Sequence, residues 1–156
     1  MPEPNLEEIV SYIVNKSLDL KNKYTDEKTA PVEFACIFCQ RDNEYQNLDR
    51  FVSELGSVVQ ETPNGKTYFL NKAIQTEAGP LRLLKVRKPD PTRKERGDAD
   101  FNTSYLSFKG KYINNPRFEL IKRDSFEMFR LSDPEFDVMS CFSSIPMSKD
   151  LGIDLK

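Results

Sequence analysis

The sequence predicts one α+β domain made of an N-terminal helix and two similar strand-helix-strand halves. Two patterns carry this prediction: apolar residues recur at helical spacing directly after Asn5, and one order of strands and helices occurs twice along the chain. With 156 residues, 38% of them hydrophobic and eleven of them Phe, the chain is long enough to bury a single core without disulfides.

The N-terminal segment, residues 1–30, is expected to hold a helix and a linker. Asn5 followed three residues later by Glu8 is a variant of the capping box that begins helices. Apolar residues then recur at helical spacing and predict an amphipathic helix over residues 6–21. The polar stretch 21–29 ends this periodicity and is expected to be a loop.

The first module, residues 31–88, combines strand and helix signals. Val32 begins a nearly continuous apolar run, and helical spacing starts at Asp42, the expected N-cap, and stops at Gly56. The sequence Asn64-Gly65 is a strong hairpin signal, because these residues tolerate the positive φ angles that such turns demand. We expect strands at 32–40, 58–61, 67–70 and 81–87, a helix over about 42–55, and a turn at Gly79-Pro80.

Residues 89–97 are expected to form a crossover between two modules. From Arg87 to Asp98 the only apolar residues are prolines, so this segment must lie at the surface. The second module, residues 98–156, repeats the order of elements but not the residue identities. We expect strands at 99–103, 118–123, 126–131 and 138–142, a helix over 104–112 with Tyr105, Phe108 and Tyr112 inward, and a loop over 143–156.

The composition excludes several kinds of chemistry. The chain has no His, the side chain best suited to proton transfer near pH 7 and the commonest nitrogen ligand for Zn or Fe. Ser-His-Asp, Cys-His and His-based metal sites are therefore excluded. Cys36 and Cys39 should face opposite sides of a strand, so with Cys141 they are interpreted as small buried apolar residues.

Charge and hydropathy predict a cytoplasmic protein. The net charge of -2 gives no long-range attraction to nucleic acid or membrane, and we see neither a signal peptide nor an apolar run that could span a bilayer. Seven Lys and Arg residues lie within 82–96. Because no aromatic residue is interleaved to stack on bases, we interpret this segment as a solvated loop and do not expect nucleic-acid binding.

The segment Val86–Phe101 carries a resemblance to a known family. A strand there ends in a Pro-x-Pro turn, passes through basic residues and enters the next strand at Gly97. This resembles the inter-module segment of the YecM-like branch of the vicinal oxygen chelate superfamily, the glyoxalase and extradiol dioxygenase group. The resemblance implies two βαβββ modules that form a curved mixed sheet around a cavity, with ligands from the first and the last inner strand of each module.

The four ligand positions implied by the resemblance are held here by Glu33, Arg87, Asp100 and Glu127. An Arg side chain does not bind metals, which leaves two outcomes. If the three carboxylates converge, they form an all-oxygen site suited to Mg²⁺, Mn²⁺ or Ca²⁺ rather than Zn²⁺ or Fe²⁺. If Arg87 pairs with one of them, the site is a polar pocket without metal that can hold a carboxylate or phosphate.

Structural roles remain as alternatives for each carboxylate. Glu33 could be a strand-entry residue near solvent, and a buried Glu33 would need a partner for its charge. Asp98 and Asp100 share a strand face, so they could act as paired carboxylates or cap the turn after Gly97. Glu127 is expected to point inward if its apolar neighbours on the same strand face are core.

The leading hypothesis is a protein that binds a small polar or anionic molecule, with or without a divalent metal. If it is a lyase or isomerase, Glu33 or Glu127 would be the base, and Arg87 or the metal would stabilise a developing oxyanion. Lys85 and Arg87 are the candidate ligand-binding residues. The alternatives are a non-catalytic binding or interaction module that has lost the metal site and, third, a nucleic-acid-associated protein that uses residues 82–96. We expect a monomer or homodimer without a membrane partner.

Overall fold

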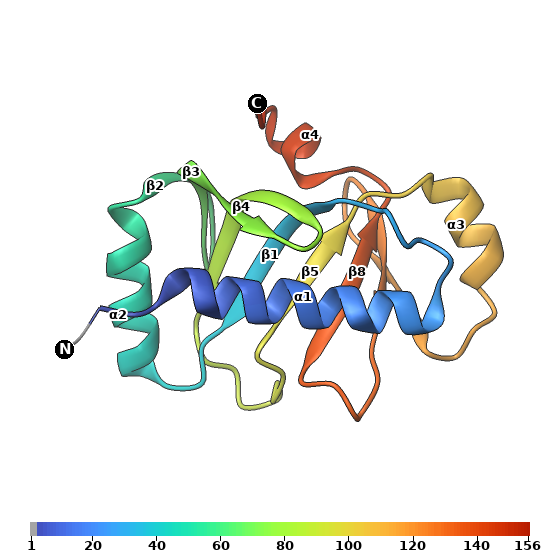
Figure 1. The fold of residues 1–156 in the computed structure, drawn as a ribbon, viewed down its shortest axis with the longest axis horizontal. Helices are drawn as coiled ribbons and strands as arrows, with labels where there is room; N and C mark the ends of the chain where they lie inside the picture. The colour runs from blue at the N-terminus through green and yellow to red at the C-terminus, as the bar shows by residue number, and fades with distance from the viewer. Residues whose placement is uncertain (1–2) are drawn as a thin grey trace.

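The computed structural model describes residues 3–156 and confirms the predicted fold class: an α+β protein with an N-terminal helix and one mixed sheet (Figure 1). Its helices are α1 (Leu6–Tyr24), α2 (Asp42–Ser53), α3 (Tyr105–Tyr112) and α4 (Met147–Leu151). Its strands are β1 (Val32–Phe38), β2 (Gly56–Thr62), β3 (Gly65–Thr76), β4 (Gly79–Arg87), β5 (Gly97–Phe101), β6 (Phe118–Lys122), β7 (Glu127–Leu131) and β8 (Val138–Ser143). No helix in this part of the chain is long and apolar enough to cross a membrane.

The sheet consists of two modules that have the same strand order and lie side by side. Its order is β2-β3-β4-β1-β5-β8-β7-β6. In each module the first strand pairs in parallel with the last, β1 with β4 and β5 with β8, and the other neighbours are antiparallel. The two first strands, β1 and β5, pair antiparallel and join the modules. Each module is therefore a βαβββ unit.

The register of the central strands defines an approximate two-fold relation between the modules. Ala35 of β1 pairs with Ala99 of β5 across the junction. These two residues also pair with Leu84 of β4 and Ser140 of β8, respectively. Because β1 and β5 are antiparallel, a half-turn about the Ala35–Ala99 pair places β1 on β5 and β4 on β8.

One face of the sheet is covered by helices and carries the hydrophobic core. α1 runs across the central strands (Figure 1), and its Val10 and Val14 side chains are fully buried. α2 and α3 lie near opposite ends of the sheet (Figure 1). Phe108 of α3 packs against Phe118 and Phe142. The helical periodicity of the sequence correctly identified the buried faces of α1 and α3.

The opposite face of the central strands is not covered by α1. Side chains alternate along a strand, so Ala35 points toward the helices and Cys36 points away from them. Cys39 packs in the helix-side core, whereas Cys36 packs with Phe38 and Met139 on the other face. This confirms that Cys36 and Cys39 face opposite sides and that both are buried.

Two local predictions are corrected by the structure. The tail over residues 143–156 was expected to be a loop, but it contains α4, which ends at Gly152 in the left-handed conformation, with φ 68°. In the hairpin of the first module, Thr62 already pairs with Gly65, so Pro63 and Asn64 form the turn. Gly65 has the positive φ of 152°, and no non-glycine residue among those described has a positive φ.

Element boundaries differ most in the first module. β3 extends to Thr76, beyond the predicted strand over 67–70. The prediction ended too early because the register of β3 shifts between Phe69 and Ile74, which interrupts the alternating pattern of side chains. Gly79 and Pro80 begin β4 rather than form the turn before it. Similarly, Asp42 is already helical, and the N-cap of α2 is the preceding residue.

Candidate functional site

A cavity of about 760 Å³ lies on the face of the sheet opposite α1. Alternate side chains of β1, β4, β5 and β8 form its floor, and the turns at residues 63–64 and 123–126 contribute to its rim. These two turns follow β2 and β6, which occupy equivalent places in the modules. Ile145 and Met147, before and in α4, also line the cavity. The cavity is therefore shared by both modules.

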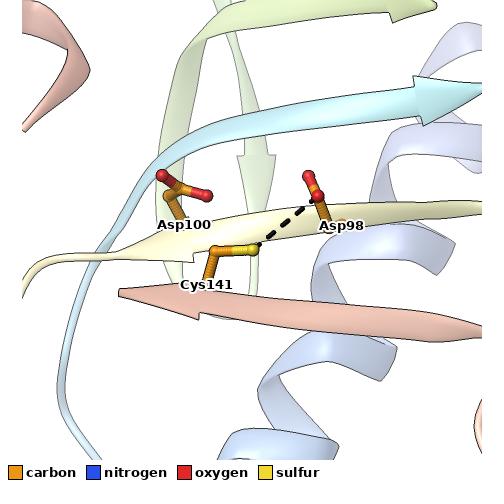
Figure 2. A group of neighbouring side chains, drawn as sticks. All are labelled: Asp98, Asp100 and Cys141. Atoms are coloured by element: carbon orange, nitrogen blue, oxygen red, sulfur yellow. Dashed lines mark hydrogen bonds between the residues drawn. The ribbon is translucent and has the colours of Figure 1, made fainter. Parts of the chain in front are cut away.

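The second module places a cluster of acidic and thiol side chains on this floor. Asp98 and Asp100 of β5 lie beside Cys141 of β8, and one potential ligand atom from each lies within 4.8 Å of the others (Figure 2). The Cys141 thiol donates to Asp98 Oδ2 at 3.7 Å, and Ser143 Oγ donates to Asp100 Oδ2 at 3.0 Å. We call Asp98, Asp100, Cys141 and Ser143 the acidic pole.

Both aspartates retain protons at higher pH than an ordinary Asp. Burial raises the pKa of Asp98 to about 6, against the opposing effects of the Cys141 thiol and nearby positive charges. Burial, followed by the charge of Asp98, raises the pKa of Asp100 to about 7, although the hydrogen bond from Ser143 opposes this rise. Carboxyl groups with such pKa values can donate or accept protons near neutral pH.

The first module places two cations on the same floor, Lys85 and Arg87 of β4. Lys85 Nζ donates to Thr62 Oγ1 at 3.1 Å, and burial lowers the pKa of Lys85. Arg87 Nη2 lies 3.0 Å from an Asp90 carboxylate oxygen, and its guanidinium lies 4.9 Å from the centre of the Phe38 ring. The Nε atom of Arg87 is buried and has no hydrogen-bond partner among residues 3–156. We call Lys85 and Arg87 the basic pole.

The structure brings together only part of the predicted site. Lys85, Arg87 and Asp100 line the cavity, whereas Glu33 and Glu127 do not. Of the two outcomes that the sequence left open, the convergence of Glu33, Asp100 and Glu127 is therefore not found. Arg87 pairs with Asp90 of the crossover and with none of the three predicted carboxylates.

Glu33 has a structural environment outside the cavity. It is only 5% exposed, its Oε2 accepts from the backbone N–H of Ser148 at 2.8 Å, and its Oε1 accepts from Asn102 Nδ2 at 2.9 Å. Ser148 lies in the first turn of α4, so Glu33 holds this helix against β1. The register of β1 shifts between Val32 and Phe34, and simple alternation does not anticipate such a shift.

Glu127 lies beside α3 and forms an ion pair there. Its Oε2 accepts from Lys109 Nζ and Tyr105 Oη, both at 2.7 Å. These two hydrogen bonds lower the pKa of Glu127. A carboxylate with a lowered pKa is a weak base, so Glu127 lacks the property expected of a catalytic base and instead connects α3 to β7.

The sequence indicated Asp98 only as one of a possible carboxylate pair with Asp100, and it did not identify Cys141 as a potential ligand. Asp98 had a usable signal, because it lies two residues from Asp100, and the structure confirms that both share a strand face. Cys141 had no such signal. Its position depends on the pairing of β8 with β5, in which Cys141 lies opposite Asp100.

Replacing Glu33 by Ala is expected to lower the free energy of unfolding by about 2–3 kcal/mol, because it leaves two hydrogen-bond donors without a partner. α4 should then detach, and the amide of Ser148 should exchange faster with deuterium. Urea denaturation and hydrogen exchange measure these effects. Glu61→Ala, at an exposed position of β2, is the control and should change stability by less than about 0.5 kcal/mol. Unchanged protection of Ser148 would contradict the assigned role of Glu33.

The chain shares its fold with a known structure but matches no family by sequence. No protein-family model and no curated protein matches it. It is similar to the structural-genomics protein EC4020, with a TM-score of 0.71 and 10% identity over 97% of both chains. A glyoxalase/bleomycin resistance protein/dioxygenase superfamily member from Vibrio splendidus 12B01 aligns with 74% of this chain and 98% of its own, with a TM-score of 0.48 and 13% identity. The first similarity shows that the fold is shared over nearly the whole chain.

Proposed function

We propose that this protein binds a small polar or anionic molecule in the cavity between its modules, as a member of the vicinal oxygen chelate type. The paired βαβββ modules support this proposal, because the superfamily has the same layout. One observation carries it: Asp98 and Asp100, both with raised pKa values, face an open cavity shared by the two modules.

Two adjacent carboxyl groups in this position destabilise the folded protein. Each loses hydration, and their charges repel each other. The ion pairs of residues 3–156 include neither Asp98 nor Asp100, and their side-chain hydrogen bonds come only from Cys141 and Ser143. Perturbed carboxyl groups of this kind are typical of sites that act on a ligand.

The acidic pole could also hold the divalent metal that the superfamily implies. Two carboxylate oxygens and one thiol sulfur within 4.8 Å of one another are a suitable donor set, and they replace the predicted set of Glu33, Asp100 and Glu127. The carboxylates suit Mg²⁺, Mn²⁺ or Ca²⁺, and the sulfur of Cys141 adds affinity for a softer ion such as Zn²⁺. A bound ion would supply a Lewis acid beside the ligand.

If the bound molecule reacts, Asp100 is the group best suited to move a proton. Its pKa of about 7 allows it to act as a base or an acid at neutral pH, the role that the sequence suggested for Glu33 or Glu127. Lys85 and Arg87 would stabilise negative charge that develops on a ligand oxygen. Proton abstraction beside a carbonyl group, as in lyases and isomerases, is the reaction class that these residues suit.

Binding without catalysis is a second candidate function, and Lys85 is the observation that favours it. By the two-fold relation, Lys85 of β4 is equivalent to Cys141 of β8. A cation thus stands in the first module where the second has a potential metal ligand. The first module therefore contributes positive charge, not metal coordination, to the shared cavity.

The positive side chains of the basic segment 82–96 lie in several different surroundings. Arg82 packs on the Phe69 ring and Arg96 on the Tyr12 ring, whereas Lys85 lines the cavity. The positive charges are thus divided among different surroundings.

A thermal-shift panel tests the proposed function. Wild-type protein, Asp98→Asn, Asp100→Asn and Arg87→Gln are mixed with divalent metal chlorides and with small carboxylates and phosphates. A ligand at about 100 times its Kd stabilises by about 2.7 kcal/mol, or roughly 5–10 °C in Tm for a chain of this size. We expect a metal-induced shift in wild type that both Asn variants lose, and a carboxylate- or phosphate-induced shift that Arg87→Gln loses; Glu61→Gln should retain both. A panel without any shift, or metal shifts that persist in both Asn variants together with anion shifts that persist in Arg87→Gln, would overturn the proposal.

A further inference from the structure

The two-fold relation places opposite chemistry in equivalent positions of one cavity. A half-turn about the Ala35–Ala99 pair places β1 on β5 and β4 on β8. This half-turn places Phe34 on Asp98 and Cys36 on Asp100. It also places Lys85 on Cys141 and Arg87 on Ser143. The cavity therefore has an acidic end from the second module and a basic end from the first.

The charges of the two poles are not paired with each other. Lys85 and Arg87 donate to Thr62 of the first module and to the crossover, whereas Asp98 and Asp100 accept hydrogen bonds from β8. Cys36 of β1 pairs with both Lys85 and Asp98. One strand thus separates the poles, with about 10 Å between their Cα atoms, as two strand spacings require.

The floor between the poles is apolar. Phe34 and Cys36 of β1 lie between the strands that carry the poles, and both line the cavity. Met128 of β7 adds another apolar side chain to the lining. A surface of this kind favours methylene groups over further polar groups.

Arg87 at the basic end, and Thr67 beside Lys85 on the adjacent strand, each carry a donor without an acceptor. The Nε of Arg87 and the hydroxyl of Thr67 are buried and have no hydrogen-bond partner in the described part of the chain. Thr67 is 1% exposed and pairs with Lys85, so it shares the face of the sheet on which the cavity lies. Buried donors without partners are costly. A carboxylate can accept two N–H groups of one guanidinium and would satisfy the Arg87 donor.

The remaining charges around the cavity do not reverse this polarity. Arg130 pairs with Cys141 in the sheet, but its guanidinium is 2.8 Å from Glu119. Arg123 and Asp124 on the rim are exposed and of opposite sign, and Asp150 of α4 is an exposed carboxylate at the edge of the lining. The poles therefore set the charge pattern that a ligand meets on the floor.

We propose that the cavity binds a small zwitterion, with its carboxylate at Lys85 and Arg87, its amine at Asp98 and Asp100, and a short methylene chain over β1. This inference rests on the proposed function and names its ligand class. The amine and a metal ion are alternative occupants of the acidic pole, so the zwitterion is tested in metal-free buffer.

Isothermal titration calorimetry with the full chain in EDTA-containing buffer tests this ligand class. The probes are β-alanine, γ-aminobutyrate, δ-aminovalerate and ε-aminocaproate, with caproate and hexylamine as analogues that lack one charge. We expect one of the two longest zwitterions to bind at least tenfold more tightly than either analogue. Equal affinity for caproate, hexylamine and ε-aminocaproate would overturn the inference.

Variants of each pole should act on one end of the ligand. Asp98→Asn is expected to weaken binding of the zwitterion and hexylamine at least tenfold and to leave caproate unchanged. Arg87→Gln should weaken the zwitterion and caproate and spare hexylamine. Lys85→Gln provides the same test if Arg87→Gln does not fold, as judged by circular dichroism. A variant that weakens all three probes equally would contradict two separate poles.

The outcomes separate this inference from the proposed function. If no zwitterion binds, but a metal binds in an Asp98-dependent manner or a carboxylate or phosphate in an Arg87-dependent manner, the inference fails and the proposed function stands. If no compound of either experiment binds, both fail. Binding of a zwitterion that is lost in Asp98→Asn and in Arg87→Gln supports both.

Discussion

Replacing Asp100 by Asn is expected to raise the free energy of unfolding by about 2–4 kcal/mol at pH 8 and by much less at pH 5. Asp100 is 9% exposed, and burial with the neighbouring Asp98 charge raises its pKa from 3.8 to about 7. Each unit of pKa difference corresponds to about 1.4 kcal/mol between the protonation states. A neutral Asn avoids the penalty of a buried charge and can still accept the hydrogen bond from Ser143.

The sign of the pH dependence follows from the raised pKa. Between the unfolded pKa of 3.8 and the folded value of about 7, the folded protein binds more protons than the unfolded chain. Stability therefore falls as the pH rises through this window. The penalty is absent well below pH 4 and is fully present above pH 7. Asp98, whose pKa is about 6, adds to the same trend.

Urea denaturation between pH 5 and pH 8 measures this effect. Wild type should lose stability across the range, and Asp100→Asn should show a flatter profile. Asp124→Asn is the matched control, because Asp124 is exposed on the cavity rim. Its profile should follow that of wild type. Parallel profiles for wild type and Asp100→Asn would show that burial does not perturb this carboxyl group.

Replacing Phe108 by Ala is expected to lower the free energy of unfolding by about 3–5 kcal/mol, because the cavity left by a buried ring is refilled only in part. Phe108 is 1% exposed. Its ring centre lies 4.3 Å from that of Phe142, 4.7 Å from that of Tyr112 and 5.8 Å from that of Phe118. With Phe129 of β7 at 6.1 Å, this single side chain connects α3 to three strands of the second module.

Chemical denaturation of Phe108→Ala and of a control on the same helix tests this prediction. Leu106 is 83% exposed, so Leu106→Ala should change stability by less than about 0.5 kcal/mol. A loss below about 1 kcal/mol for Phe108→Ala would mean that α3 does not depend on the aromatic cluster. A comparable loss for Leu106→Ala would mean that this exposed side chain is covered in solution.

The sequence determined the elements whose signals are local. Helical spacing of apolar residues correctly predicted α1 and the inward face of α3, where Phe108 lies, because one turn of helix repeats the same contact with the core. Alternation correctly placed Cys36 and Cys39 on opposite faces. The recurring order of strands and helices correctly indicated two βαβββ modules. Such patterns depend on neighbours within a few residues and are visible without the fold.

Only the tertiary structure decided which polar side chains meet. Cys141 lies beside Asp98 because β8 pairs with β5, and nothing near Cys141 in the sequence specifies that pairing. The resemblance implied a cavity position for Glu33, but the shifted register of β1 and the unpredicted α4 give it another partner in Ser148. Glu127 likewise meets its partner, Lys109 of α3, only because this helix docks beside β7. Strand pairing and helix docking join residues far apart in the chain, so a single sequence can indicate the carboxylates but not their partners.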